Sequence, residues 1–556
     1  MTQPVMPTEM LLTVPDRWEQ VCEGEGKAAL ESILLHVLAT RRWFGGKGRT
    51  IRSVRIAETI PIPSRSKTAI LFFLRVEYGD GMEETYLWPL TVASGVLADQ
   101  IRREFPIAVV AGIRIRQGVR DDAGLLFDAL WDPDVAQSLL EAMRQGLSFN
   151  GVAGTLKASS TGAYARLANG ATGLDPDVMK WEQSNTSVAF GSRMILKLYR
   201  RLGSGVNPDL EIGRALTRTN FPYIPPVAGM LEYAKGSEEP VTLALLQGFV
   251  RNEGDAWRHS LEALNRFFMR IGEGDAPPAR EAKPALLQLA REDYPKPARD
   301  LIGLYLQSAE RLGQRTAELH LALSQVPGDP AFAPEPMTAA YQNARYGAMI
   351  RLARQTLALL RERMASFHQA RRAEACRLLE LEPAIERTFE SFRSLRTSVP
   401  RIRCHGDYHL GQVLCTGSDF MIIDFEGEPA RSLAERRMKH PAVLDVAGMV
   451  RSFHYAPFAF LNGRRDGVMI ASGTPTLSSE AWARFWSDWS SAAFLKAYLV
   501  IAEGAHFWPR AEADAAILLE AYVLEKALYE LMYELNNRPD WAIIPLRGLL
   551  EVLGNR

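Results

Sequence analysis

The sequence predicts an α+β protein, in which a strand-rich first part is followed by a larger and mostly helical second part. Runs with strand character, such as residues 68–78, occur between residues 51 and 90. From residue 255 onward the pattern changes to long helical segments separated by polar or proline-containing stretches. A chain of 556 residues also exceeds the usual size of a single hydrophobic core. We therefore expect two or three lobes.

The strand-rich part begins with a small α/β module. A helical stretch ends near Thr40, and three strand-like runs follow it, with Gly79-Asp80-Gly81 between the last two. Gly and Asp accept the positive φ angles of a tight turn, so these two runs predict a β-hairpin. Residues 146–176 are rich in Gly, Ser, Ala and Thr, which favours loops and predicts a module boundary.

Beyond this boundary the pattern predicts strand, turn, strand and helix. Residues 188–202 contain two short β-like runs around Gly191-Ser192, and helical spacing follows at 208–216. Farther on, one helix is expected to bury a stripe of apolar residues at intervals of three and four, namely Ile350, Ala353, Leu357, Leu360 and Met364.

Composition excludes several classes of protein. Lys and Arg total 65 and Asp and Glu total 65, so no net charge draws the chain to nucleic acid or anionic lipid. Four cysteines are too few for a disulfide scaffold. The N-terminus lacks the pattern of a signal peptide, and the apolar segment 491–505 is interrupted by Lys496 and Glu503. We expect a soluble cytoplasmic protein that binds neither nucleic acid nor membrane.

The most informative segment is Arg403-Cys-His-Gly-Asp-Tyr-His-Leu-Gly-Gln412, which is followed by an Asp-Phe-Glu at 424–426. Asp407 precedes Gln412 by the interval that separates the catalytic Asp from the metal-binding Asn in kinases. Asp424 opens an Asp-Phe-Glu where kinases carry Asp-Phe-Gly. This spacing is typical of phosphoryl transfer from ATP.

Phosphoryl transfer requires an aligned acceptor hydroxyl and Mg²⁺ on the phosphates. Asp407 can act as the base, Gln412 and Asp424 can hold the metal, and Glu426 can reach a second ion. The alternative is a plain turn with an Asp at the end of a strand, but two acids and an amide at this spacing favour the functional interpretation.

Cysteine and histidine side chains in the same segment also suggest a zinc site, formed by Cys404, His405, His409 and Cys415. Their spacing matches no standard ligand pattern. His405 is more simply a structural hydrogen-bonding residue of the loop.

A kinase also needs a cation over the phosphates. Lys197 lies in the middle of a predicted strand, as the β3 lysine of kinases does, and Glu211 on the following helix is the expected partner. The alternative for a strand lysine is solvent exposure. The segment 182–187 supplies hydroxyls for a phosphate-covering loop, although it lacks the usual glycines; its candidate contacts are Ser184, Thr186 and Ser187.

The apolar segment 243–250 lies in sequence between these residues and the helical part. It is expected to be the hinge that meets adenine, through Gln247 and Phe249. It could also be only an interior strand.

Taken together, these motifs resemble those of the bacterial maltokinases, relatives of the aminoglycoside phosphotransferases within the protein-kinase-like fold. The resemblance covers most of the chain and rests on motifs in the same order: Arg42-Trp-Phe-Gly-Gly-Lys47, residues 182–201, Val206-Asn-Pro-Asp209, Arg315-Thr-Ala-Glu-Leu-His320, the segments at 405–407 and 424–429, Asp445-Val-Ala-Gly-Met449, and residues 533–541.

The resemblance implies a bilobal kinase-like fold. Residues 1–150 would form an N-terminal cap module, 151–250 an antiparallel-sheet ATP lobe, and 251–556 a helical lobe that binds a disaccharide. Asp407 would be the base, Gln412 and Asp424 the Mg²⁺ ligands, and Lys197 the phosphate contact. The product would be maltose 1-phosphate, a precursor of α-glucan, and a trehalose-isomerising enzyme is a possible partner.

Two features depart from the family pattern, the approach to residue 445 at 439–444 and extra length around 360–395. The candidate sugar contacts are His409, Tyr533, Glu534, Asn537 and Arg538, although residues of these last four types on a helix are often only polar surface or a structural ion pair. The alternatives are a kinase acting on glucosamine or another sugar, and an inactive nucleotide-binding regulatory domain. The presence of Lys197, Asp407 and Asp424 argues against inactivity, and activity requires the lysine to meet the two aspartates around MgATP.

Overall fold

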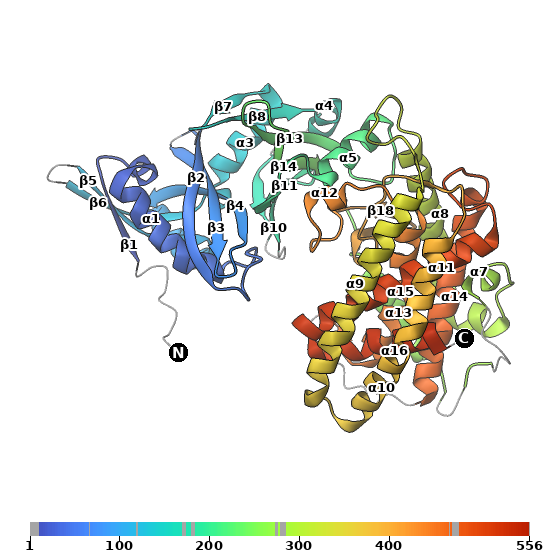
Figure 1. The fold of residues 1–556 in the computed structure, drawn as a ribbon. Helices are drawn as coiled ribbons and strands as arrows, with labels where there is room; N and C mark the ends of the chain where they lie inside the picture. Colours follow the sequence, from blue (N-terminus) through green and yellow to red (C-terminus); the bar gives the residue numbers. More distant parts are fainter. Residues whose placement is uncertain are drawn as a thin grey trace. The chain divides into compact units, whose positions relative to one another are not determined.

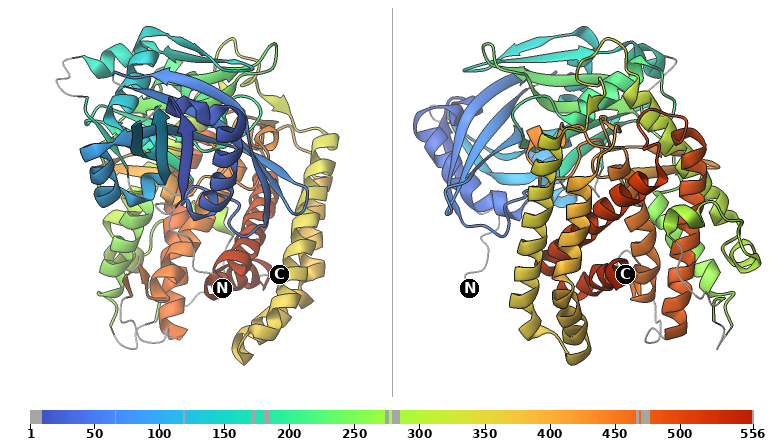
Figure 2. Two further views of the ribbon diagram at one scale, coloured as in Figure 1. Left: turned by 90° about the vertical axis from the view of Figure 1, so that its left-hand side faces the viewer. Right: turned by 45° about the vertical axis from the view of Figure 1, so that its right-hand side comes forward.

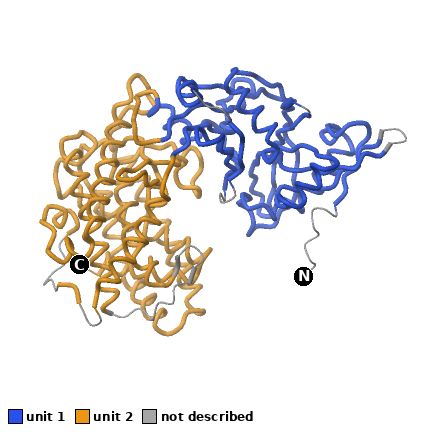
Figure 3. The backbone as a smooth tube through the Cα atoms, turned by 180° about the vertical axis from the view of Figure 1, so that it is seen from behind, with its two compact units in different colours: residues 1–217, 225–250 blue, residues 218–224, 251–556 orange. Residues whose placement is uncertain are grey.

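The computed structural model describes residues 10–65, 67–117, 120–169, 174–179, 184–272, 276–278, 285–465, 468–469 and 477–554. The chain divides into two compact units, which Figure 3 colours separately. Unit 1 comprises residues 1–217 and 225–250, and unit 2 comprises residues 218–224 and 251–556. The short segment 218–224 groups with unit 2 because the Ile422 amide donates to the Tyr223 carbonyl (2.8 Å) and Arg315 lies over the Tyr223 ring.

Unit 1 holds two sheets, of which the first has the strand order β1-β5-β6-β4-β3-β2, with β12 paired to β4 (Figure 1). Among the described strands of this sheet, only the β1–β5 pairing is parallel. The strands are β1 Leu11–Pro15, β2 Ile51–Pro63, β3 Thr68–Tyr78, β4 Glu83–Ser94, β5 Val109–Gln117, β6 Arg120–Asp128 and β12 Arg201–Leu202. The helices are η2 Trp18–Cys22, α1 Gly24–Val37, η3 Leu38–Thr40, α2 Gly95–Glu104, η4 Pro106–Ala108, η5 Ala129–Trp131 and α3 Pro133–Gln145.

The predicted hairpin is confirmed. β3 and β4 pair antiparallel, with Glu77 opposite Glu83, so the turn falls at 79–81 as expected. β3 is a nearly continuous apolar run because both of its faces are buried. Phe72 and Leu74 pack into one core cluster, and Leu71 and Phe73 pack into another.

The second sheet of unit 1 is antiparallel and has the order β7-β8-β13-β14-β11-β10-β9. Its strands are β7 Ser148–Asn150, β8 Thr155–Ser160, β9 Pro176–Val178, β10 Asn185–Phe190, β11 Met194–Tyr199, β13 Val227–Ala234 and β14 Val241–Gly248, and its helices are α4 Gly162–Ala168 and α5 Pro208–Arg218. The predicted order of strand, turn, strand and helix is confirmed by β10, β11 and α5.

The loop expected at 146–176 is wrong in part, because this segment contains β7, β8 and α4. Small residues are needed there for close packing rather than for flexibility. A Cβ added to Gly154 would lie 2.5 Å from the Tyr233 ring. The turn between β7 and β8 also contacts the first sheet, because the Glu58 carboxylate of β2 accepts hydrogen bonds from the amides of Val152 (2.7 Å) and Ala153 (2.8 Å). The Tyr233 hydroxyl of β13 donates to the same carboxylate (2.6 Å).

Unit 2 is mostly helical. α8 packs against α14, α13 packs against α14 and α15, and α9 packs against α11 and α15 (Figure 2). The helices are α6 Ala256–Phe268, α7 Leu286–Leu289, η6 Ala298–Ile302, α8 Leu304–Ser324, α9 Ala339–Arg363, η7 Met364–Ser366, α10 Gln369–Glu380, α11 Glu382–Ser394, η8 Leu410–Gln412, α12 Leu433–Arg436, α13 Val443–Leu461, α14 Leu477–Ala502, α15 Glu512–Asn537, η9 Pro539–Ala542 and α16 Ile543–Gly554. The strands are β15 Glu335–Pro336, β16 Pro400–Arg401, β17 Val413–Thr416, β18 Asp419–Ile422, β19 Arg464–Arg465 and β20 Val468–Met469.

Two predictions about these helices can be checked. Along α9, four residues of the predicted apolar stripe are buried, whereas the fifth, Met364, lies in η7 and is half-buried. Residues 491–502 of the interrupted apolar segment lie inside α14, and most of them are buried. Within the described residues, no helix combines the length and the apolar character that crossing a membrane requires.

Candidate active site

The predicted catalytic loop of unit 2 is held by a buried carboxylate on α13. Asp445 is 1% exposed, and its oxygens accept hydrogen bonds from the backbone amides of His405 (2.7 Å) and Gly406 (2.9 Å). His320 of α8 contacts the same carboxylate at 3.1 Å and contacts the Tyr498 hydroxyl at 2.9 Å. Burial raises the pKa of Asp445, but His320, His405 and the hydrogen bond from the Gly406 amide together outweigh burial, and the net pKa lies below its ordinary value.

A second clamp joins the loop to the residue before Asp424. The amide of Ile423 donates to the Gln412 carbonyl (3.0 Å), and the Ile423 carbonyl contacts His405 Nε2 (2.9 Å). These contacts confirm that His405 is a structural residue of the loop. Because the peptide of Ile423 is fixed on both sides, the backbone position of Asp424 is fixed relative to Gln412.

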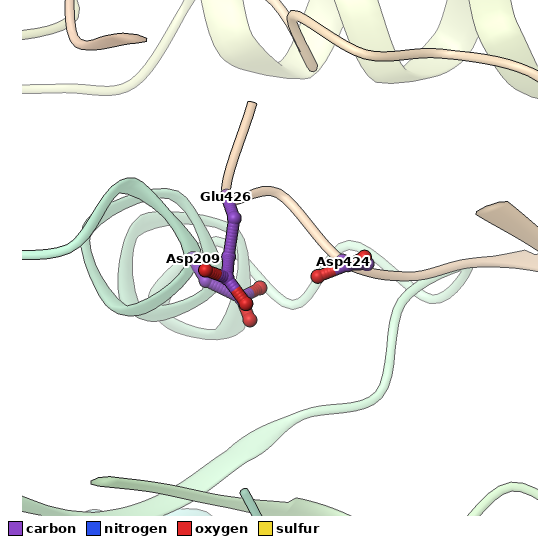
Figure 4. A group of neighbouring side chains, drawn as sticks. All are labelled: Asp209, Asp424 and Glu426. Carbon is purple, nitrogen blue, oxygen red and sulfur yellow. The ribbon is translucent and has the colours of Figure 1, made fainter. Parts of the chain in front are cut away.

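Asp424 itself has a φ of 66°, in the left-handed region that non-glycine residues rarely adopt. Positive φ outside glycine is enriched at functional sites, because the surrounding structure must stabilise it. In Figure 4 the side chains of Asp424 and Glu426 extend from the segment that follows β18. β18 ends at Ile422, so Asp424 lies just past a strand, close to where the sequence placed it.

Asp407 has a partner that the sequence did not reveal. Lys526 of α15 donates from Nζ to Asp407 Oδ1 at 2.9 Å, and Lys526 Nζ lies 3.8 Å from Glu428. His409 Nε2 lies 3.9 Å from the other Asp407 oxygen. Burial raises the pKa of Asp407, but Lys526 and His409 outweigh burial and hold the pKa well below its ordinary value. The carboxylate is therefore ionised at neutral pH.

The charges around Asp407 also shift the pKa of Lys526. Burial lowers the pKa of Lys526, but the carboxylates of Asp407 and Glu428 raise it above its ordinary value. His409 has a pKa lowered chiefly by burial, so its ring is mostly neutral near pH 7.

A small cavity of about 40 Å³ lies beside Asp407, within unit 2. Besides the loop, it is lined by acidic, basic and aromatic side chains, among them Glu428, Arg431, Glu525, Lys526 and Tyr529. Four carboxylates line it, those of Asp407, Glu428, Asp445 and Glu525, against two cations, Arg431 and Lys526. Most of these charges are paired within the protein, since Arg431 lies 2.6 Å from Glu428, Arg345 binds Glu525 and Lys526 binds Asp407.

The sugar contacts predicted on α15 lie beyond this cavity. Tyr533, Glu534, Asn537 and Arg538 are not among the described residues that line it; Lys526 and Tyr529, earlier on the same helix, line it instead. Glu534 is 3% exposed and bonds Arg538 (2.7 Å) and the Tyr455 hydroxyl (2.9 Å), which is a structural ion pair. The assignment of these four residues to the sugar stays a prediction, and the geometry favours the structural alternative.

In unit 1, Lys197 lies in the middle of β11, as predicted, and is buried. Its Nζ contacts Asp209 Oδ2 at 3.1 Å, and the Tyr199 hydroxyl donates to the same oxygen at 3.0 Å. Asp209 lies in the first turn of α5 (Figure 4), and its amide donates to the Asn207 side chain at 3.0 Å. The sequence named Glu211 as the partner of Lys197. The structure gives the lysine Asp209, two residues earlier, and the role of Glu211 stays a prediction.

The two predicted phosphate contacts that lie in β10, Thr186 and Ser187, do not share one face. Ser187 lies directly opposite Lys197 in the ladder, so their side chains share a face of the sheet. Thr186 points to the other face, where its hydroxyl accepts from Arg200 Nε at 2.8 Å. The structure therefore does not bring Thr186 together with Lys197. Ser184 is exposed just before the strand, and residues 182–183 lie outside the described residues.

The predicted hinge follows a central strand. Gln247 of β14 pairs with Ile195 on one side and Val227 on the other, and the Phe249 amide donates to the Arg193 carbonyl at 2.9 Å. The interior-strand interpretation is confirmed, since β14 lies inside the sheet order, and the boundary between the units follows it at residue 250. The hinge role stays a prediction. The adenine contacts stay a prediction.

The donor set of unit 2 suits Mg²⁺. Asp424, Glu426 and Gln412 offer carboxylate and amide oxygens, which are hard ligands of the kind that Mg²⁺ takes. The zinc alternative is not supported, because Cys404, His405, His409 and Cys415 do not form a metal-binding group among the described residues. Burial raises the pKa of both Cys404 and Cys415, so neither is a ready thiolate ligand.

An immobile loop carboxylate, oxygen donors on either side of the β17–β18 hairpin and a strand lysine paired with a helix carboxylate are the parts that a kinase-like phosphotransferase requires. Residues 252–467, which include the loop, match the phosphotransferase enzyme family. Residues 38–132 match the maltokinase N-terminal cap domain. Residues 252–467 are therefore similar to the phosphotransferase enzyme family, and residues 38–132 are similar to the maltokinase cap, which confirms the resemblance found in the sequence.

The chain is also similar to individual proteins, at 21–26% sequence identity. A glucosamine kinase of Streptacidiphilus jiangxiensis is 26% identical over 383 residues, which are 67% of this chain and 73% of that protein. A glucosamine kinase of Mycolicibacterium smegmatis is 23% identical over 419 residues, 75% of this chain and 88% of that protein. A solved glucosamine kinase in complex with glucosamine, ADP and inorganic phosphate has a TM-score of 0.56 and 21% identity, and the match covers 90% of this chain and 94% of that one. This likeness confirms the predicted fold class.

Proposed function

We propose that this protein is a sugar kinase that transfers the γ-phosphate of ATP, bound with Mg²⁺, to a hydroxyl of a small sugar, with glucosamine as the favoured acceptor. The observation that carries this proposal is the Asp407 carboxylate, which is ionised by Lys526 and held by the loop that Asp445 anchors. An ionised and immobile carboxylate is what an acceptor hydroxyl needs for orientation.

The low pKa of Asp407 fits phosphoryl transfer better than it fits strong base catalysis. The transition state is loose, so the hydroxyl proton need not leave early, and positioning with charge stabilisation supplies most of the rate. In this proposal Asp407 orients the hydroxyl and accepts its proton late. Asp424 and Gln412 hold Mg²⁺, which neutralises phosphate charge, and Lys197 contacts the phosphates.

The choice of glucosamine rests first on the similar proteins. In this proposal Glu428, whose carboxylate lines the cavity beside Asp407, contacts the protonated amine of the acceptor. Both relatives described above are glucosamine kinases. Maltose, which the sequence favoured, remains the second candidate because of the maltokinase-type cap; the trehalose-isomerising partner and a role in α-glucan synthesis depend on that candidate.

Steady-state assays with MgATP and a panel of sugars test the proposal. Glucosamine and glucose differ in one amine, so their ratio of kcat/KM isolates its contribution. We expect glucosamine to exceed both glucose and maltose by about tenfold or more, the range that one charged contact supplies. The Glu428→Gln variant should narrow the ratio of glucosamine to glucose. A preference for maltose would overturn the acceptor, and binding of MgATP without turnover on any sugar would favour an inactive regulatory domain.

A further inference from the structure

The cap part of unit 1 contains a second cavity, of about 270 Å³, built from segments far apart in the sequence. Its wall includes Trp43 of the motif Arg42-Trp-Phe-Gly-Gly-Lys47, to which the proposed reaction assigns no role. The exposed Arg42 and Glu104 also line it, so the cavity is accessible from solvent. It is distinct from the cavity beside Asp407, which lies in unit 2.

The innermost cation of this cavity is Arg200, which follows β11 and is 1% exposed. Its Nε donates to Thr186 Oγ1 at 2.8 Å, and its Nη2 donates to Asp128 Oδ2 at 2.5 Å. Among the described residues, no acceptor lies within hydrogen-bond reach of its buried Nη1. Buried guanidinium donors in folded proteins are normally satisfied, so this donor calls for a partner.

A second buried guanidinium lines the same cavity. Arg41 is 4% exposed, and its two terminal nitrogens donate to the carbonyls of Ile107 and Val109. Its buried Nε has no partner among the described residues. Burial lowers the pKa of Arg41 to about 10, Asp128 offsets part of this effect, and the charge of Arg200 adds to it.

The buried charges of this cap cluster, defined as Arg41, Asp128 and Arg200, do not balance. Asp128 is the buried carboxylate among the lining residues, and its oxygens already accept from Arg200, from Trp88 Nε1 (3.1 Å) and from the Leu130 amide (3.1 Å). Two buried cations therefore share one carboxylate whose acceptors are occupied. A buried charge normally has a counter-charge, so the cavity is built to receive an anion.

The remaining wall of the cavity is aromatic. Trp43, Phe105 and Trp131 line it, and the rings of Phe105 and Trp131 pack against each other at 4.8 Å. Aromatic rings offer flat apolar surface to a ring-shaped ligand. The volume lies just below the range of typical small-molecule pockets, which favours one sugar ring over a nucleotide.

We infer that this cavity is a binding site for a sugar phosphate, in which the phosphate pairs with the guanidiniums of Arg41 and Arg200 and the ring packs against the aromatic wall. Phosphate oxygens accept the hydrogen bonds that Arg200 Nη1 and Arg41 Nε can donate. The site can also influence turnover, because Arg200 bonds Thr186, and the next residue of β10, Ser187, lies opposite Lys197. A bound phosphate thus contacts the strand next to the lysine.

Isothermal titration calorimetry on the Asp407→Asn variant, with the nucleotide site saturated by MgADP, tests this inference. The readout is binding without turnover, so it does not depend on the proposed reaction. We expect glucose 6-phosphate to bind, inorganic phosphate to bind at least about tenfold more weakly because it lacks the ring, and glucose not to bind. The charge-conserving changes Arg200→Lys and Arg41→Lys should each weaken the binding of glucose 6-phosphate at least about tenfold, because lysine loses the planar fork.

The matched control is Arg114→Lys. Arg114 lies on β5 of the first sheet, its side chain is 43% exposed, and its Nε lies 3.9 Å from Asp121. It should leave the affinity for glucose 6-phosphate unchanged. Thermal unfolding of each variant checks that the cap is folded. Failure of glucose 6-phosphate to bind the folded protein would overturn the inference, as would binding that Arg200→Lys and Arg41→Lys leave unchanged. Equal affinity for inorganic phosphate would remove the role of the aromatic wall and with it the sugar phosphate.

Discussion

Two clusters of buried charge in this chain differ in how their charges are paired. In unit 2, the catalytic-loop cluster, defined as Asp407, Asp445 and Lys526, gives every charge a partner, through an ion pair, two backbone amides and a histidine. In unit 1, the cap cluster leaves two guanidiniums with one occupied carboxylate. The difference separates two kinds of site, since paired charges hold a catalytic group in a fixed state and unpaired cations favour an anionic ligand.

Of the changes to the paired charges of unit 2, Asp407→Asn should have the largest effect on kcat. The amide keeps the size of the side chain but cannot accept the acceptor proton, so kcat should fall by about 10²- to 10⁴-fold. Binding of MgADP and of glucose 6-phosphate should persist, because neither needs the base. Coupled ADP assays and calorimetry measure these quantities, and an unchanged kcat would remove Asp407 from its role.

The anchor of the loop should matter less than the base itself. In Asp445→Asn, one amide oxygen replaces two carboxylate oxygens, so the amides of His405 and Gly406 lose an acceptor and the loop shifts. We expect kcat to fall by about 10- to 100-fold, because small displacements of reacting groups are costly. The free energy of unfolding should also fall by about 1–3 kcal/mol.

The control for this prediction is Asp419→Asn. Asp419 is the first residue of β18, in the β17–β18 hairpin that follows the loop. Asp419 holds Arg315 through two contacts, at 2.7 and 2.6 Å, but does not contact the loop amides. It should lower the melting temperature and leave kcat within about twofold. If both variants lose kcat in proportion to stability, Asp445 has no special role in positioning the loop.

The parts of this architecture that could be predicted from sequence are those encoded locally. The spacing of Asp407, Gln412 and Asp424 lies within 18 residues of chain, and the strand position of Lys197 follows from its neighbours. The β3–β4 hairpin was predictable because glycine and aspartate mark its turn. The loop expected at 146–176 failed because glycine and alanine also serve close packing, which composition cannot distinguish from flexibility.

The partners that decide how the sites work are encoded at long range. Lys526 lies 119 residues from Asp407 in the sequence, and Asp445 lies 39 residues from Gly406. A lysine or aspartate on an otherwise ordinary helix carries no local signal of its partner. Asp209 was within reach, since it ends the motif Val206-Asn-Pro-Asp209, but the sequence favoured Glu211, the other acid on the same helix turn.

The smallest effect at neutral pH, and the sharpest test of charge pairing, is expected for Lys526→Met. In the wild type, burial raises the pKa of Asp407, but Lys526 together with His409 and His405 lowers it further, so Asp407 causes no loss of activity above about pH 4. Without the lysine, burial dominates and the pKa of Asp407 rises above its ordinary value. The active carboxylate is then lost as pH falls, and the acid limb of kcat/KM should move to about pH 5–7.

At pH 8 the same variant should lose only a few fold in kcat/KM, because Asp407 is ionised there with or without its partner. Lys439→Met is the matched control, since Lys439 is a buried lysine of unit 2 that pairs with Glu335 at 2.8 Å and does not contact Asp407. It should leave the acid limb in place. The stability of the wild type should show the same linkage: the contribution of Asp407 is present above its unfolded pKa of about 4 and lost as pH falls below it. An acid limb that stays in place in Lys526→Met would mean that another group controls the charge of Asp407, and the contrast between paired and unpaired clusters would no longer explain its state.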